Sequence, residues 1–315
     1  MKRLVLALSF IVALSGCSST TNPNLATRPN AVGNRVSPQS LGTWTRKAPM
    51  PTLRDYLAAA TLNGELYALG GTNGGGQILT TVEAYDRHSN RWTTKAAMPT
   101  GRFGLVAGVV GGLLYAVGGG TNSITLNANE AYDSLTNSWS VKAVMPTSRE
   151  DAAAGVVNGQ LYVIGGAAGT RVLDVVEAYD PTTNSWTTKA PMPTARAALA
   201  AGVIDGIIYA VGGSTRSIFL NTLEAYDPST NSWTTKAPTP TARNLIAAGV
   251  INGKLYVVGG NNGAKLRTVE AYNPVTNTWT TKQSLPTALD HLGVGVVAGE
   301  LYAVRSTKNY KYSPQ

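Results

Sequence analysis

Acidic, aromatic and histidine side chains recur at one kind of place in this chain, the two positions after the arginine of a Pro-Thr-x-Arg run. Near the end of the chain a leucine takes the place of that arginine. The pairs are Asp55-Tyr56, Phe103-Gly104, Glu150-Asp151, Ala197-Ala198, Asn244-Leu245 and Asp290-His291. If these segments lie on one face of the domain, four carboxylates and a histidine there suit a cationic or polyhydroxylated ligand. Such groups also serve as general acids and bases. The alternative is that these side chains are only solvated and bind nothing.

These pairs belong to a tandem repeat that covers residues 41–315. Tyrosines at 67, 115, 162, 209, 256 and 302 mark six copies, and five of the copies continue into a Gly-Gly pair. A glutamate in a Glu-Ala-Tyr pattern follows in five copies, and all six tryptophans of the chain are repeat marks, at 44, 92, 139, 186, 233 and 279. We expect these tryptophans to be large buried aromatics.

The order Tyr-x-x-Gly-Gly, Glu-Ala-Tyr, Thr-Asn-x-Trp, with a period of 46 to 48 residues, resembles the kelch repeat family. The resemblance implies an all-β, six-bladed propeller. Four strand-like runs can be read in each unit, and Asn-Gly or Asp-Gly dipeptides join the first run to the second, as in tight hairpins.

The last unit lacks its fourth strand, whereas the segment from Leu41 to Pro49 copies the fourth-strand pattern at the other end of the domain. We therefore expect the N-terminal strand to complete the sixth blade and close the ring, which removes exposed sheet edges.

The repeat spacing predicts which face binds ligands. The tryptophan-to-tyrosine spacing is 23 residues and the glutamate-to-tryptophan spacing is 9 residues in every unit that has both residues, whereas the connection between the second and third strands varies in length. Strand alternation brings this connection to the same face as the Pro-Thr-x-Arg segments, and variable loops on a rigid scaffold carry binding residues. The candidate ligand-binding residues are Asp55, Tyr56, Phe103, Glu150, Asp151, Arg171, Arg216, Phe219, Asn244, Asp290 and His291.

The sixth unit also lacks two charges that the other five units have. Leu289 stands for the opening arginine, and Tyr310 stands for the glutamate of the third strand. Losing both together is what a buried, mutually satisfying ion pair would require, because either charge alone inside a sheet stack is costly.

Several enzyme classes do not fit this sequence. Copper radical oxidases resembling galactose oxidase need a cysteine crosslinked to a tyrosine and two histidine ligands, but this chain has only Cys17, His88 and His291. No G-x-S-x-G, H-E-x-x-H or P-loop pattern is present. We predict a lipid-anchored, non-catalytic binding or interaction module of the cell envelope, which takes a protein or glycan ligand at the loop face and has no catalytic residue, metal or cofactor. The alternative is an envelope carbohydrate-active enzyme resembling a sialic-acid mutarotase, which needs only general acid–base groups.

The N-terminus reads as an export signal. Residues 1–16 combine a basic start with a short apolar run, and Leu14-Ser15-Gly16-Cys17 resembles the lipobox of bacterial lipoproteins. We expect Cys17 to carry the lipid and residues 17–40, rich in Ser, Thr, Asn and Pro, to be a flexible linker. The expected location is the bacterial cell envelope, at its periplasmic face or the cell surface, with a protein or glycan partner.

The formal net charge of +9 does not predict nucleic-acid binding. Twelve of the 26 basic residues recur at fixed repeat positions, for example three residues after each tryptophan, so they are spread around a ring instead of forming one patch.

Overall fold

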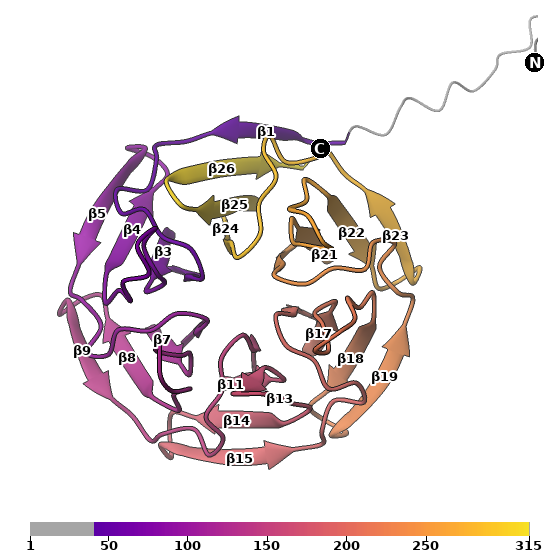
Figure 1. Cartoon of the computed structure of the whole chain (residues 1–315), viewed down its shortest axis with the longest axis horizontal. Helices are drawn as coiled ribbons and strands as arrows, with labels where there is room; N and C mark the ends of the chain where they lie inside the picture. The colour runs from indigo at the N-terminus through magenta and orange to yellow at the C-terminus, as the bar shows by residue number, and fades with distance from the viewer. Residues whose placement is uncertain (1–40, 315) are drawn as a thin grey trace, which may run out of the picture. The chain divides into compact units, whose positions relative to one another are not determined.

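The computed structural model describes residues 41–314, so the predicted signal peptide (1–16) and the predicted lipidated Cys17 with its linker (17–40) lie outside the described residues. Within residues 41–314 all regular elements are β-strands, and no helix that could span a membrane is found there. Six four-stranded sheets surround an open centre, which confirms the predicted six-bladed propeller (Figure 1).

In each blade the strands are antiparallel neighbours, from the innermost strand outward. Blade 1 consists of β2 (Ala58–Leu62), β3 (Glu65–Leu69), β4 (Val82–Asp86) and β5 (Arg91–Lys95). Blade 2 consists of β6 (Val106–Val110), β7 (Leu113–Val117), β8 (Asn129–Asp133) and β9 (Ser138–Val141). Blade 3 consists of β10 (Ala153–Val157), β11 (Gln160–Ile164), β14 (Val176–Asp180) and β15 (Ser185–Lys189), with the short hairpin β12 (Ala167–Ala168) and β13 (Arg171–Val172) inserted.

Blade 4 consists of β16 (Ala200–Ile204), β17 (Ile207–Val211), β18 (Leu223–Asp227) and β19 (Ser232–Lys236). Blade 5 consists of β20 (Ala247–Ile251), β21 (Lys254–Val258), β22 (Val269–Asn273) and β23 (Thr278–Thr281). Blade 6 consists of β24 (Gly293–Val297), β25 (Glu300–Arg305), β26 (Lys308–Ser313) and β1 (Thr43–Arg46).

The ring closes as predicted, because β1 pairs with β26 (Figure 1). Trp44 lies opposite Tyr312 in this pairing. The Leu41 carbonyl accepts hydrogen bonds from the Tyr312 hydroxyl at 2.6 Å and from the Gln283 backbone N–H at 3.1 Å. Gly42 has a φ of 82° and lies so close to the Tyr312 ring that a side chain would collide with it. The chain therefore needs glycine where it enters the propeller.

A repeated set of hydrogen bonds joins each blade to the one before it. At one junction the Asn184 side-chain oxygen accepts from its own blade's Tyr179 hydroxyl at 2.7 Å and from the Ala143 backbone N–H at 2.9 Å. The Trp186 indole donates to the Ala143 carbonyl at 2.8 Å. Blade 6 has no such asparagine, and the Leu41 carbonyl takes its place. Junctions of this kind hold the ring together without covalent links.

The tryptophans are half-buried, and the expectation of fully buried indoles is wrong. Each indole packs on a tyrosine of its own blade, as Trp186 does on Tyr179 with ring centroids 5.2 Å apart. The outermost strand has a neighbour on one edge only, so one side of the indole meets solvent.

Five buried arginine–glutamate pairs confirm the pairing predicted from blade 6. Arg196, whose side chain has no exposed surface, donates from Nη1 to Glu224 at 2.5 Å, and the second oxygen of Glu224 accepts from Thr194 at 2.7 Å. In blade 6 the pair is replaced by buried Leu289 and Tyr310, and the Tyr310 hydroxyl lies 3.3 Å from the Thr287 hydroxyl. Tyrosine thus keeps the threonine contact of the glutamate without its charge.

Candidate functional site

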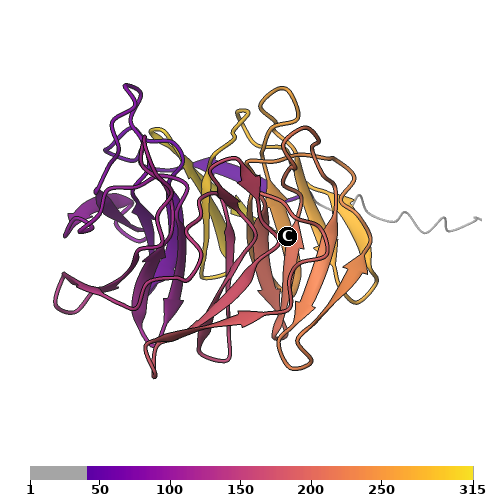
Figure 2. The ribbon, with the colours of Figure 1, turned by 60° about the horizontal axis from the view of Figure 1, so that its bottom comes forward.

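The variable connections and the Pro-Thr-x-Arg segments meet on one face of the ring, as predicted. Asp55 exchanges two backbone hydrogen bonds of 2.9 Å with Thr72, which lies just after the Gly-Gly pair, and blades 2 to 5 repeat this contact. Figure 2 shows the longer loops rising above one end of the strands. This loop face therefore has a backbone framework of its own.

A rim of six residues, one from each blade, surrounds the central channel at the loop face. All six have left-handed backbones with φ between 47° and 59°. Five backbone N–H groups donate across blade boundaries to the preceding rim carbonyl, at 2.8–3.0 Å. The rim residues are Tyr56, Gly104, Asp151, Ala198, Leu245 and His291. Left-handed backbone costs an L-residue about 1–2 kcal/mol, and the bonds on either side offset that cost here.

The rim is different where blade 6 meets blade 1. Here the rings of Tyr56 and His291 pack against each other at an angle of 46°, with their centroids 3.7 Å apart. Tyr56 also makes an edge contact with Phe103, with centroids 5.8 Å apart. Aromatic side chains therefore run along the rim from blade 6 to blade 2.

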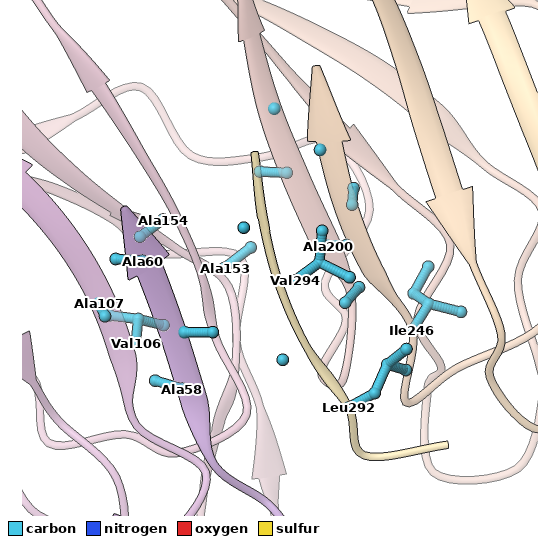
Figure 3. Close-up of a pocket in the computed structure, with 18 of the residues that line it drawn as sticks. Ala58, Ala60, Val106, Ala107, Ala153, Ala154, Ala200, Ile246, Leu292 and Val294 are labelled. Carbon is cyan, nitrogen blue, oxygen red and sulfur yellow. The ribbon is translucent and has the colours of Figure 1, made fainter. Parts of the chain in front are cut away.

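The rim encloses a pocket of about 130 Å³, and beneath it lies a channel of about 410 Å³. Both are bordered by a collar of apolar residues, namely Leu57, Leu105, Ala152, Leu199, Ile246 and Leu292. Small and apolar side chains such as Ala58, Ala107 and Ala154 line the channel (Figure 3). The innermost strands are sheet edges, so backbone groups also face the channel. Among residues 41–314, no ionisable side chain lines the channel itself.

Arg305 is a mouth residue that we did not predict from the sequence. Its guanidinium binds Asp55 with two contacts of 3.0 Å and reaches Asp290 at 3.2 Å. It thereby links blade 6 to blade 1. The sequence does single out this position, because Arg305 stands where the other units have the first glycine of the Gly-Gly pair.

The local fold of blade 6 explains this exchange. In the other blades the second strand stops at a glycine with φ near 60°, and a long loop follows. In blade 6 β25 continues through Arg305, and a two-residue turn leads directly into β26. An extended position accepts a side chain, and the missing loop leaves room for the guanidinium.

Asp290 and His291 form a second polar contact beside Arg305. His291 Nδ1 lies 3.3 Å from Asp290, and Asn261 donates to the other carboxylate oxygen at 3.2 Å. Burial lowers the pKa of His291, although Asp290 opposes the shift. Burial raises the pKa of Asp290, but hydrogen bonds from Asn261 and the charges of His291 and Arg305 outweigh it, so the net shift is downward.

Glu150 and Asp151 lie across the rim from His291 and have a different environment. Burial raises the pKa of Asp151 to about 7, and the charge of Glu150 adds to this shift. Burial also raises the pKa of Glu150. The Asp151 side chain is partly buried and opens into the rim pocket. With a pKa of about 7, Asp151 is close to half-protonated at neutral pH.

The remaining predicted residues lie outside the rim pocket. Asn244 donates to the Ser214 hydroxyl at 3.0 Å. Arg171, in β13, and Arg216 have exposed side chains, and Phe219 is 39% exposed. The rim thus brings Tyr56, Asp151 and His291 together, whereas the loop residues face solvent. Within residues 41–314, no three His, Cys, Asp or Glu side chains cluster closely enough to hold a metal ion.

Six four-stranded blades closed by strands from both ends of the domain, around a channel with a polar mouth, define a six-bladed β-propeller. The chain belongs to the kelch-repeat family, since a family profile described as the KLHDC2/KLHL20/DRC7 Kelch-repeats domain matches residues 39–192 and 141–303. The solved structure of YjhT is similar in fold, with a TM-score of 0.72 and 19% identity over 83% of this chain and 94% of YjhT. No curated protein matches this sequence.

Proposed function

We propose that this protein is a lipid-anchored binding module of the bacterial cell envelope, which holds a protein or glycan ligand at the loop face of its propeller. The observation that carries the proposal is the rim pocket, where Tyr56, Asp151 and His291 converge on a rigid backbone ring. Preformed concave sites with a few convergent polar groups are the usual form of ligand sites.

The lipid anchor rests on the lipobox-like sequence that ends at Cys17. Several acyl chains on one cysteine would hold the protein at a membrane, since stable anchoring takes more than one chain. The linker to residue 40 would then allow the propeller to reach ligands away from the bilayer.

Binding can be tested with a glycan array and with pull-downs from envelope extracts, comparing the protein with a Tyr56→Ala, His291→Ala double variant. A ligand held at the rim is lost in the double variant but is retained when the exposed Thr136, on the opposite face, is changed to alanine. A ligand that both variants bind equally well lies elsewhere, and the proposal would then fail.

A second function is favoured by one specific observation: Asp151, with a pKa of about 7, and His291, with a pKa lowered by burial, both border the rim pocket. Anomer interconversion of a sugar such as sialic acid needs one group to take the anomeric hydroxyl proton and another to protonate the ring oxygen. Asp151 and His291 have suitable proton affinities for this work. A mutarotation assay followed by NMR, with Asp151→Asn as the comparison, separates this enzyme from a non-catalytic module.

A further inference from the structure

The charged side chains at the mouth fall into two groups, one with counterions among the described residues and one without. In the first group Arg305 neutralises Asp55 and Asp290 directly, and Lys265 adds a fourth charge 3.6 Å from Asp290. These ion pairs join blade 6 to blade 1, and their charges are already balanced without a ligand. Glu150 and Asp151 form the second group, and no hydrogen bond or counterion from residues 41–314 stabilises their charged forms.

The surroundings of the second group are open and aromatic. The Asp151 carboxylate lies over Gly104, where an added Cβ would come within 2.8 Å of its oxygen. The Glu150 carboxylate and the tip of the Phe103 ring lie over Gly120 in the same way. Tyr56 borders the rim pocket beside Asp151, and burial raises the pKa of its hydroxyl, with the charge of Asp151 adding to the shift. These two glycines leave room for both carboxylates to lie directly against the backbone, beside the rings of Tyr56 and Phe103.

We propose that the cage formed by Glu150, Asp151, Tyr56 and Phe103 over Gly104 and Gly120 binds a primary ammonium group of the ligand. A bound cation would supply the positive counter-charge that neither carboxylate has within the described part of the chain. The faces of the aromatic rings attract the cation further. The proposal rests on the function proposed above, because it assigns the ligand chemistry of the same mouth.

The charge distribution of the protein supports a cationic ligand. The chain carries a formal net charge of +9, yet four carboxylates meet two cations at the mouth, and one of these cations is already shared by two aspartates. An anionic ligand would find the guanidinium of Arg305 occupied. The rim pocket of about 130 Å³, which Tyr56, Gly104 and Asp151 border, suits one compact group, such as a lysine side chain or an amino sugar ring.

The proposal can be tested by NMR titration of the full chain with matched probes. Nα-acetyl-lysine amide is compared with its Nε-acetylated form, and glucosamine with N-acetylglucosamine. We expect the charged probe of at least one pair to bind, and its neutral counterpart to bind at least tenfold more weakly. Which pair responds identifies the source of the ammonium group.

Asp151→Asn is the decisive variant, because asparagine also tolerates the left-handed backbone of this position. We expect it to raise the Kd of the charged probe at least tenfold. Asp205→Asn is the matched control, since Asp205 lies in a hairpin turn of the opposite face where three other blades have asparagine, and it should leave the Kd unchanged.

The pH dependence gives a second readout. Because the cation binds ionised Asp151, whose pKa is about 7, the Kd of the lysine probe should fall roughly tenfold between pH 6 and pH 8. Equal binding of charged and neutral probes, an unchanged Kd in Asp151→Asn, or no binding by either charged probe would overturn the proposal. If N-acetylglucosamine or sialic acid binds at the rim instead, the binding module stands and only the ammonium assignment fails.

Discussion

The buried pair Arg196–Glu224 makes the sharpest prediction about stability. Removing one partner, by Arg196→Leu or Glu224→Tyr, leaves an uncompensated charge at a site where the two side chains are 0% and 3% exposed. Such a change typically costs about 3–5 kcal/mol. For a domain of this size that loss lowers the melting temperature by roughly 6–20 °C.

The double variant Arg196→Leu, Glu224→Tyr should recover much of the loss, because it recreates the arrangement of Leu289 and Tyr310 in blade 6. The new tyrosine hydroxyl can reach Thr194 as Tyr310 reaches Thr287. Recovery should be incomplete, since the Ala210 carbonyl loses the hydrogen bond of 3.0 Å that Arg196 donates to it.

The assay is a double-mutant cycle followed by thermal and urea unfolding. We expect a coupling free energy of about 1.5–3 kcal/mol between the two positions. A second cycle on the partly exposed pair Lys95 and Glu65, 3.5 Å apart, serves as the control and should give below about 1 kcal/mol. Additive losses at Arg196 and Glu224 would refute the reasoning, and the shared replacement of both residues in blade 6 would then be coincidental.

Three further predictions concern the anchor, the closure and the rim. Cys17→Ala should move the protein from the membrane to the soluble fraction without changing its circular dichroism spectrum, and continued sedimentation with membranes would contradict the lipid anchor. Gly42→Ala should lower the melting temperature well below that of Gly64→Ala, which has a similar positive φ but open space, and equal losses would mean that contact with Tyr312 is unimportant. Asp151→Asn should stabilise the fold at pH 8 by up to roughly 4 kcal/mol, because the raised pKa disfavours the charged carboxylate. That gain should shrink as the pH falls through 7 toward 4, and a pH-independent gain would contradict the shift.

Most of the fold could be predicted from the repeat because each blade packs equivalent residues against its neighbours in the same way. The six copies of the repeat predicted six blades, and the copy of the fourth strand at Leu41 to Pro49 predicted the closure of the ring. The joint replacement at Leu289 and Tyr310 predicted the buried ion pair of the other blades. The half-buried tryptophans were missed because a repeat pattern indicates that a residue is structural, not how much solvent reaches it.

The candidate site was less predictable, because it depends on contacts between blades that are far apart in the sequence. Arg305 looked like a lost glycine until the fold placed it between Asp55 and Asp290. The directions of Arg171, Arg216 and Phe219 depend on the conformations of individual loops, which follow no repeat. The pKa of Asp151 depends on how the rim excludes water, which the order of residues along the chain does not specify.

The rim has a consequence for how such a protein can change over evolutionary time. Its shape comes from backbone hydrogen bonds between neighbouring blades, and one conformation accommodates tyrosine, glycine, aspartate, alanine, leucine and histidine in the same ring. A substitution at one rim position therefore does not require compensating changes at the other five. A lineage could acquire a new ligand through a few independent single mutations while the propeller beneath them stays the same.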